Sequence, residues 1–387
     1  MSGDTFLVIR GSRDKLRDLS FMHIDDLKQT IQKMITQYFS VIKKYAPSHS
    51  LESSIGLDIG ASRCKAVEVV RTQKGFKILH WVIEPIEKGD IASCVKRVLE
   101  KSGKECKEVY TAVSGQGTLI RFIKMPRMPV AQLKESLRLE ADKYFPFPSS
   151  DIYMDCQILD DDKVKENKMA VMVAVAKKEI IKERLALVAS LGLPGSCVGL
   201  NAIALANAVI ELKQEGSKDP FLSDKKEAFA VIDIGEVKTT VVIFREYVAR
   251  FTREISIGGK DLTQKMMGIL GSHFEEAERV KCNPGNRGDE VFAACQPVLS
   301  SLASEIRLSF DYFSSEDGAK VSKVFLTGQS ASLIHIKDFF AKELEIDTEE
   351  WKPSRELEFG EHVSAEAFFA NINQLSVALG LAVSHDD

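Results

Sequence analysis

Asp58 and Asp233 occur in the same short pattern in two distant parts of the chain. Each aspartate ends an apolar run and is followed by Ile-Gly and then by a second run rich in β-branched residues. Glycine in such a turn can take positive φ and lets backbone N–H groups approach phosphate oxygens, which predicts this conformation at Gly60 and Gly235. Two carboxylates that face each other across a cleft need a cation between them, and Mg²⁺ binds carboxylates while it keeps waters and substrate phosphates. The pair therefore predicts a Mg-nucleotide site between two matched hairpins.

An ordinary hairpin turn is the alternative explanation, because Asp and Gly are the usual turn residues. One copy alone favours that explanation, whereas two copies on matched apolar hairpins favour a nucleotide clamp. The β-branched residues after each glycine predict a second strand, whereas a P-loop or a dinucleotide-binding turn opens a helix. The sequence contains no Gly-x-x-x-x-Gly-Lys-Ser/Thr, no Gly-x-Gly-x-x-Gly and no His-Glu-x-x-His pattern. A clamp made of two hairpins is thus the leading hypothesis.

The composition is that of an ordinary globular protein of two or three domains. Of the 387 residues, 28% are charged and 44% hydrophobic, and the formal net charge is −4, so nothing indicates a nucleic-acid binder. The cysteines are odd in number and scattered, without a Cys-x-x-Cys pair, and predict neither a disulfide framework nor a zinc site. The first residues do not resemble a leader, and no apolar run reaches the length of a membrane span. A cytoplasmic location is the expectation.

Residues 1–50 precede the first hairpin, and 24–45 in them predict one amphipathic helix. Leu27, Ile31, Met34, Tyr38 and Val41 recur at steps of four and three, which places them on one stripe. Such a stripe packs on its own domain or on something else, either a partner or a membrane surface. Both alternatives stay open, and residues 47–50 are interpreted as a linker.

The rest of the chain alternates between strand and helix patterns, which predicts an α/β fold. Besides the two hairpins, we expect strands at 76–83, 108–113, 119–124, 152–159, 169–176, 196–200 and 324–327. We expect helices at 91–101, 130–144, 179–191, 201–212, 261–270, 274–281, 291–313, 336–344 and 365–383. The polar segment 213–226 is interpreted as a hinge. The β-α-β-β-α block within 118–196 is predicted to form a separate subdomain.

Three motifs in this order carry a resemblance to a known superfamily. They are Leu57-Asp58-Ile59-Gly60, then Ile232-Asp233-Ile234-Gly235 with Thr239-Thr240, then Leu326-Thr327-Gly328. They resemble the two phosphate motifs and the adenosine motif of the actin, DnaK-chaperone and sugar-kinase superfamily. Within it, residues 50–385 are most similar to the PilM family of type IV pilus assembly proteins, relatives of the cell-division protein FtsA.

The resemblance implies a two-lobed α/β actin-like fold with an inserted FtsA-like subdomain in the first lobe. The domains would be an N-terminal extension (1–50), a first lobe (51–117, 197–215 and 360–387), the inserted subdomain (118–196) and a second lobe (216–359). It implies ATP and Mg²⁺ in the cleft, with Asp58 and Asp233 holding the metal through water. The cofactor-binding residues implied are Asp58, Gly60, Ala61, Ser62, Lys65, Asp233, Gly235, Lys238, Thr239, Thr240, Gly328, Gln329 and Ser330.

Several residues depart from the pattern of the superfamily, among them Arg63 and Cys64, and two of the departures bear directly on nucleotide binding. Glu236 places a carboxylate beside the phosphates, which is unfavourable unless Lys238 or Mg²⁺ compensates for it. Gln329 stands where the adenosine loop has a further glycine, and would either narrow the adenine slot or hydrogen-bond the base. No residue is assigned a catalytic role, so slow ATP hydrolysis or none is expected.

The function implied is that of an ATP-binding cytoplasmic scaffold in a type IV pilus or related secretion platform, attached to the inner membrane through a partner. That partner would be the cytoplasmic tail of a PilN-like membrane protein, and other platform components and self-association are further possibilities. Phe145 and Phe147 are the candidate partner contacts, with burial inside the subdomain as the alternative. An active ATPase or kinase of the same superfamily and a nucleotide-free structural relative are the alternative functions.

Overall fold

The computed structural model describes residues 53–73, 75–102, 108–159, 167–193, 196–213, 226–353 and 357–384. The predicted helix at 24–45, the linker after it and most of the predicted hinge lie outside the described residues. The helices within these ranges are all too short or too polar to cross a bilayer.

The first lobe is built on a six-stranded sheet with the strand order β14-β3-β2-β1-β4-β8. Its strands are β1 (Ser53–Ile59), β2 (Arg63–Thr72), β3 (Gly75–Pro85), β4 (Glu108–Val113), β8 (Cys197–Leu200) and β14 (Glu358–Phe359). Strand β1 pairs antiparallel with β2 and parallel with β4, so it lies in the middle of the sheet. The turn after β1 is therefore held on both sides by paired strands.

The second lobe repeats this plan in a five-stranded sheet with the order β11-β10-β9-β12-β13. Its strands are β9 (Glu227–Ile234), β10 (Thr239–Arg245), β11 (Val248–Ile255), β12 (Lys320–Thr327) and β13 (Asp347–Glu350). Strand β9 pairs antiparallel with β10 and parallel with β12, as β1 does with β2 and β4. The two Asp-Ile-Gly turns thus occupy equivalent places in two sheets.

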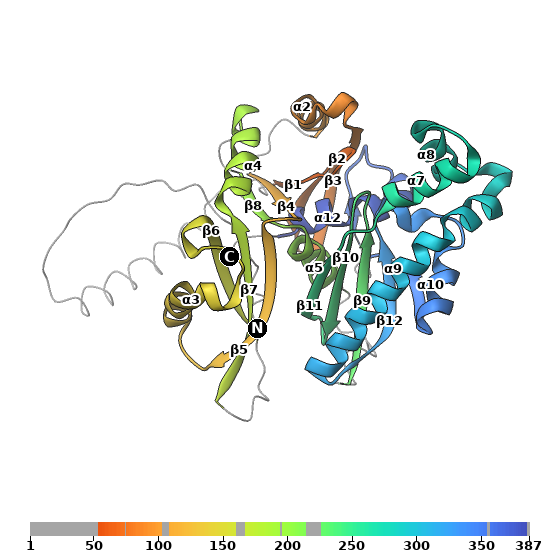
Figure 1. The fold of residues 1–387 in the computed structure, drawn as a ribbon. Helices are drawn as coiled ribbons and strands as arrows, with labels where there is room; N and C mark the ends of the chain where they lie inside the picture. Colours follow the sequence, from red (N-terminus) through yellow and green to blue (C-terminus); the bar gives the residue numbers. More distant parts are fainter. Residues whose placement is uncertain are drawn as a thin grey trace, which may run out of the picture.

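Two helices, α5 (Asn201–Glu211) and α12 (Ile372–Ala382), lie between the two sheets and join them into one core (Figure 1). Val67 of the first sheet and Val231 of the second both belong to the apolar cluster around these helices. The packing is close at two glycines. A Cβ on Gly56 would lie 1.9 Å from the carbonyl oxygen of Ala378, and one on Gly380 would lie 1.8 Å from that of Ala204. Helix α12 therefore fixes the position of β1 and of α5 together.

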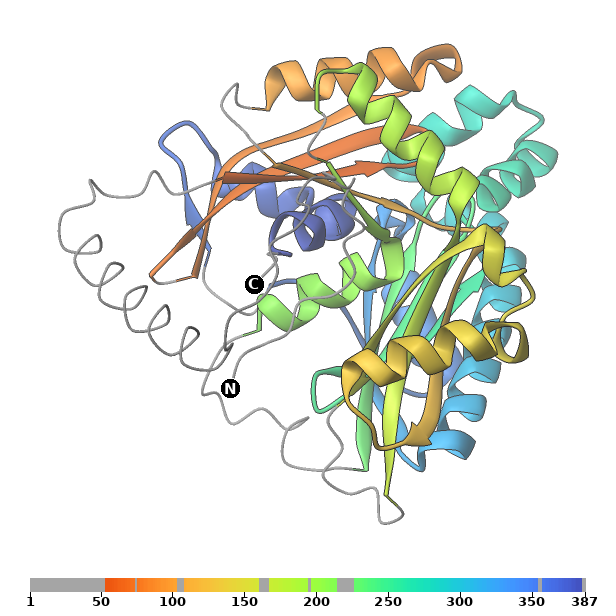
Figure 2. The same ribbon diagram turned by 90° about the vertical axis from the view of Figure 1, so that its left-hand side faces the viewer.

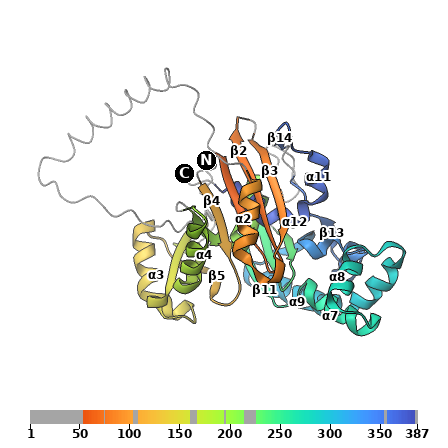
Figure 3. The same cartoon turned by 90° about the horizontal axis from the view of Figure 1, so that it is seen from above.

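Other helices cover the outer faces of both sheets (Figure 3). On the first sheet these are α2 (Ile91–Lys101) and α4 (Lys178–Ser190), whose Val95 and Val188 join the same cluster as Leu57. The second sheet carries α7 (Gly259–Leu270), α8 (Phe274–Cys282), α9 (Gly288–Asp317) and α10 (Ile336–Leu344). Short 3₁₀ turns complete the chain at η1 (Glu87–Gly89), η2 (Ser149–Asp151), η3 (Gly285–Arg287) and η4 (Gln329–Ser332).

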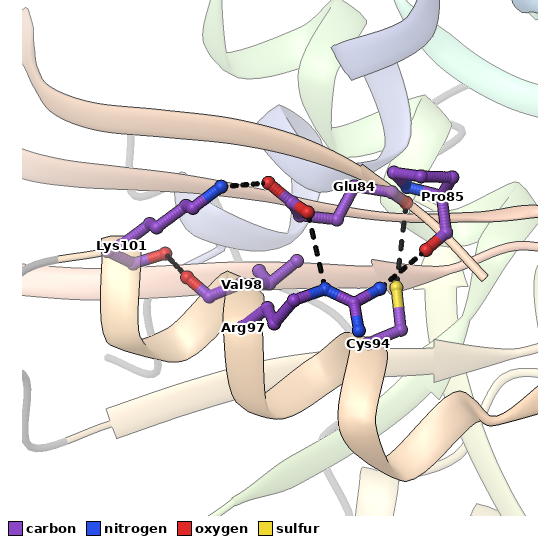
Figure 4. Close-up of polar contacts among 7 residues, drawn as sticks. Glu84, Pro85, Cys94, Arg97, Val98 and Lys101 are labelled. Atoms are coloured by element: carbon purple, nitrogen blue, oxygen red, sulfur yellow. Dashed lines mark hydrogen bonds and ion pairs between the residues drawn. The ribbon is translucent and has the colours of Figure 1, made fainter. Parts of the chain in front are cut away.

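Helix α2 is tied to the end of β3 by polar contacts as well as by packing (Figure 4). The carboxylate of Glu84 accepts hydrogen bonds from Arg97 Nε at 3.4 Å and from Lys101 Nζ. Arg97 also donates to the carbonyl of Pro85 at 2.8 Å. These bonds hold α2 in register along the sheet and away from the cleft between the lobes.

A third, three-stranded sheet belongs to the block inserted after β4 (Figure 2). It contains β5 (Thr118–Pro126), β6 (Ile152–Leu159) and β7 (Lys168–Lys177) in the order β5-β7-β6, with α3 (Val130–Tyr144) packed on it. Strand β7 pairs antiparallel with both neighbours, so β5 and β6 are the edges of this sheet.

The sequence-based expectation for the C-terminal segment is wrong in one respect. Instead of one helix over 365–383, the chain forms α11 (Ala365–Ala370) and α12, with a break at Asn371. The carbonyl of Asn373, in the first turn of α12, accepts a hydrogen bond from Gly328 N at 2.7 Å, a tertiary contact that local propensity does not predict. Strands β11, β13 and β14 were also not predicted.

Candidate functional site

The two Asp-Ile-Gly turns have the same geometry. Gly60 N donates to Arg63 O at 2.9 Å, and Gly235 N donates to Lys238 O at 3.0 Å. Neither glycine has the positive φ that we expected from the sequence. The need for glycine comes instead from the lack of space for a side chain, because a Cβ at either position would lie 3.0 Å from the carbonyl oxygen across the turn. The glycines therefore allow a tight turn and are not there for a left-handed backbone.

A cavity of about 140 Å³ lies between the two turns. Of the residues predicted to bind a cofactor, it is lined by Asp58, Gly60, Ala61, Ser62, Lys65, Asp233, Gly235, Lys238, Thr240, Gly328 and Gln329. Thr239 and Ser330 do not line it. The Thr239 hydroxyl is buried and donates to the carbonyl of Ile257 at 2.8 Å, and Ser330 packs against Gly259.

Lys65 and Asp58 form an ion pair at the floor of this cavity. The distance from Lys65 Nζ to Asp58 Oδ2 is 2.9 Å, and the two side chains are 15% and 7% exposed. The strand register sets this contact, because Asp58 on β1 lies directly opposite Lys65 on β2. Burial acts to lower the pKa of Lys65, but the nearby carboxylates of Asp58 and Asp233 outweigh it and raise the pKa. The ammonium therefore stays charged inside the cleft.

Asp233 has no such direct ion-pair partner in the described part of the chain. Burial raises its pKa to about 6, and the neighbouring charge of Asp58 adds to this effect, while Lys65 and Lys238 oppose it. Its ionised form is thus unfavourable in the ligand-free cleft, as expected for a carboxylate in an enclosed site. A cation close to Asp233 would lower its pKa and stabilise the charged form.

Lys238, a predicted phosphate contact, is already bonded within the protein. Its ammonium donates to Glu254 Oε1 at 2.8 Å, and Glu254 Oε2 accepts from Gly115 N at 2.9 Å. Gly115 belongs to the loop after β4, so Glu254 links the first lobe to the second. Glu254 was not among the predicted site residues, because strand β11, which carries it, has no clear signal in the sequence.

Glu236, which departs from the superfamily pattern, lines the same cavity. Its Oε2 atom is enclosed and has no hydrogen-bond partner among the residues that the structure describes. The sequence left Lys238 or Mg²⁺ as the charge that compensates for this carboxylate, and Lys238 pairs with Glu254 instead. A buried polar atom without a partner costs about 1–3 kcal/mol, so Glu236 marks a place for a cation, a water molecule or a donor group.

Several lining residues were not predicted. They are Ser114, Asn201, Asn373, Gln374, Ser376 and Val377. Ser114 lies in the loop after β4, and the others come from α5 and α12. No local pattern distinguishes them. The amide side chains at the starts of α5 and α12 are the one feature of the sequence that could have indicated polar groups facing the cavity.

The chemistry of the residues that line the cavity fits a phosphate-bearing ligand with a divalent cation. Two turns offer backbone N–H groups and two lysines, and Asp58 and Asp233 are the carboxylates available to a cation. Among the described residues, no group of three or more His, Cys, Asp or Glu side chains is arranged to hold a metal ion. A metal here would thus depend on phosphate and water ligands, as Mg²⁺ commonly does. The cavity volume is below the roughly 300–1,000 Å³ of ligand pockets, so a whole nucleotide requires the lobes to move apart.

Phe145 and Phe147 lie in the inserted block. Phe145 is 4% exposed and belongs to the core under α3, as the alternative explanation anticipated. Phe147 is half-buried, and Lys177 Nζ lies 5.3 Å above its ring centroid. A partner contact through either side chain remains a prediction.

A groove runs between the inserted block and the second lobe, along β5 and β11. Both strands are edges of their sheets, and in the described part of the chain neither has a strand paired on its outer side. Two cavities of about 240 and 290 Å³ follow these edges, and Ile120 and Thr252 line both of them. The second cavity also contains Phe122, Phe251 and Tyr312, so the groove is partly apolar.

One protein family and several solved structures are similar to this chain. The sequence profile of the family described as type IV pilus assembly protein PilM matches residues 56–385. A solved PilM-PilN type IV pilus biogenesis complex is similar to the chain with a TM-score of 0.72 and 26% identity, over 85% of this chain and 97% of that one. The ethanolamine utilization protein EutJ from Carboxydothermus hydrogenoformans has a TM-score of 0.51 and 15% identity, over 93% and 100% of the two chains, a likeness of fold alone.

A shorter similarity links the chain to cell division protein FtsA of Bacillus subtilis (strain 168). The identity is 31% over 102 residues, which are 25% of this chain and 23% of the FtsA chain. The match thus spans less than a quarter of that relative's length.

Proposed function

The chain has the actin-like fold and belongs to the family of type IV pilus assembly protein PilM, and from this premise we propose that it is an ATP-binding scaffold of a pilus assembly platform. In this role it would hold the cytoplasmic tail of a PilN-like membrane protein and respond to nucleotide by changing the angle between its lobes. Other platform components and a second copy of the chain are further candidate partners.

The pair of equivalent turns on one cavity is the observation that carries the nucleotide part of this proposal. Gly60 and Gly235 end equivalent strands, and Lys65 and Lys238 follow them at the same cavity. Phosphate groups would take hydrogen bonds from the turns and charge from the lysines, and Mg²⁺ would neutralise the two aspartates through water. All of these groups come from rigid strand ends, which suits a site that senses a ligand.

Opening of the cleft is part of the same proposal, because about 140 Å³ is too small for ATP. The bond from Gly115 N to Glu254 Oε2 joins the two lobes at this point. A phosphate that takes Lys238 from Glu254 would weaken this bridge, and the lobes would then move relative to each other. This provides a route from nucleotide binding to a change in shape without any chemical step.

The groove along β5 and β11 supports the partner part of the proposal. An extended segment can add to an unpaired sheet edge through main-chain hydrogen bonds and place alternate side chains in pockets. Ile120, Phe122 and Phe251 provide the apolar contacts for such side chains. The solved PilM-PilN complex is the reason to name a PilN-like tail as the occupant.

Isothermal titration calorimetry with Mg-ATP tests the nucleotide part. Asp58→Ala and Asp233→Ala should each weaken binding about tenfold or more, since each removes a carboxylate from the cation site. Asp289→Ala is the matched control, because this aspartate is fully exposed on α9 and should leave the affinity unchanged. Absence of any heat with folded wild-type protein would favour the nucleotide-free structural relative.

Fluorescence anisotropy with a labelled peptide that copies the PilN-like tail tests the partner part. Ile120→Asp should weaken binding about tenfold or more, because it puts a charge into the apolar part of the groove. Leu139→Asp is the control, since Leu139 is 78% exposed on α3, outside this groove. Equal loss in both variants, or none in Ile120→Asp, would place the partner site elsewhere.

An active ATPase is the second candidate function, and Glu236 is the observation that favours it. An enclosed carboxylate oxygen without a partner, next to the phosphate-facing turn, could orient a water molecule for attack. Steady-state phosphate release should then fall at least about tenfold in Glu236→Gln while ATP affinity stays or rises. Release at background level in both proteins would leave the scaffold as the function.

A further inference from the structure

The ammonium group of Lys65 has an unusual position, because lysine side chains are usually exposed to solvent. It lies between two lobes, 2.9 Å from Asp58 Oδ2, with the lysine side chain 15% exposed. Lysine side chains are rarely enclosed to this degree unless they are paired. The register of β1 and β2 places it there, since Asp58 and Lys65 are directly opposite each other in the ladder.

The second carboxylate of the cavity comes from the other lobe. Asp233 ends β9 in the place equivalent to Asp58 on β1, and both side chains line the same cavity of about 140 Å³. Lys65 lines this cavity together with both aspartates and is bonded to Asp58. One ammonium group therefore shares a cavity with two carboxylates that belong to different lobes.

The charges around the cavity balance without any ligand. Its lining contains the acids Asp58, Asp233 and Glu236 and the bases Arg63, Lys65 and Lys238. Lys238 pairs with Glu254, and Arg63 Nη1 donates to the amide oxygen of Gln374 at 3.5 Å. Lys65 is thus the lining cation that is bonded directly to one of the two aspartates.

We propose that the Lys65 ammonium occupies a divalent-cation site between Asp58 and Asp233 in the ligand-free protein. The inference rests on the proposed function for its purpose, because phosphate oxygens would draw Lys65 away from Asp58 and open the site to Mg²⁺. Free Mg²⁺ would be kept out by the positive charge of Lys65, and the metal would enter together with the nucleotide. Without nucleotide, the Lys65 ammonium would lie between Asp58 and Asp233. With nucleotide bound, Mg²⁺ would take that place.

The test measures binding of Mn²⁺ alone, without nucleotide, by electron paramagnetic resonance. Mn²⁺ prefers the same carboxylate and water ligands as Mg²⁺ and gives a signal that changes on binding. Wild-type protein should bind it weakly, and Lys65→Met should bind it about tenfold more tightly or better, because one positive charge beside the two carboxylates is removed. Methionine keeps a straight apolar chain of similar length.

Three further variants make the result specific. Lys238→Met removes another cavity-lining lysine and should gain less Mn²⁺ affinity than Lys65→Met, because Lys238 is held by Glu254 whereas Lys65 is the direct partner of Asp58. Lys65→Met combined with Asp233→Asn should lose the gain, because the second carboxylate is gone. Lys65→Gln keeps a hydrogen-bond donor toward Asp58 and serves if Lys65→Met does not fold.

The outcomes separate this inference from the proposed function. Gained Mn²⁺ affinity in the Lys65 variants, with no heat of ATP binding in wild type, would support the cation site and overturn nucleotide binding. ATP binding in wild type, with no Mn²⁺ gain in either folded Lys65 variant, would overturn the cation site and leave the proposed function intact. A gain of the same size in Lys238→Met would also overturn it, since the effect would then be general to the charge of the cleft.

Discussion

Asp233→Asn should stabilise the ligand-free protein at neutral pH while it weakens Mg-ATP binding. The pKa of Asp233 is raised from its ordinary 3.8 to about 6 by burial in the cleft. At about 1.4 kcal/mol per pKa unit, this difference corresponds to roughly 3 kcal/mol that ionised Asp233 costs the folded state. Asparagine has nearly the same shape and no charge, so up to that amount is recovered.

The pH dependence follows from the sign of this shift. Between pH 4 and pH 6 the folded chain holds the Asp233 proton more tightly than the unfolded chain, so the stability of the wild type falls as pH rises through this range. The advantage of Asp233→Asn should therefore be small near pH 4, grow toward pH 6 and stay constant above it. Thermal unfolding followed by tryptophan fluorescence should show a midpoint higher by roughly 5 °C at pH 7.5.

Asp58→Asn is the matched control, and its effect should have the opposite sign. It removes the direct partner of the enclosed Lys65 ammonium and leaves that charge without its ion pair. Loss of one partner of a buried pair destabilises by about 3–5 kcal/mol, and less here because Lys65 is partly solvated. A lower midpoint in both variants, or a difference between Asp233→Asn and wild type that does not change with pH, would refute the reasoning.

Three further predictions concern the core and the ends of the chain. Gly380→Ala should lower the free energy of unfolding by about 1–3 kcal/mol or more, measured by urea titration, because the new Cβ would meet the carbonyl of Ala204. Phe145→Ala should lower it by about 3–5 kcal/mol and Phe147→Ala by much less in the same assay, since only Phe145 is fully enclosed; equal losses would contradict this. Deletion of residues 1–46 should leave the calorimetric affinity for ATP unchanged, and failure of the shortened chain to fold would show that this segment belongs to the core.

The sequence alone was sufficient for the elements that depend on local interactions. Helices α3 and α10 begin and end at the predicted residues, because their limits are set by hydrogen bonds within the helix and by nearby prolines or turns. The two Asp-Ile-Gly turns were predicted for the same reason, since each is closed by residues three apart. The resemblance to the actin-like superfamily rested on these local motifs and their order, and the fold is as it implied.

Tertiary structure decided which charges meet in the cleft. Lys238 pairs with Glu254 and leaves a carboxylate oxygen of Glu236 without a partner, and the Thr239 hydroxyl is directed at Ile257. Asn201 and Asn373 reach the cavity because α5 and α12 pack between the sheets at distances set by the whole core. Electrostatic and hydrogen-bond partners are chosen by distance in space, and residues from six separate segments of the chain surround this one cavity. Those distances do not follow from the order of neighbouring residues. The site forms only because the two sheets pack against the same pair of helices.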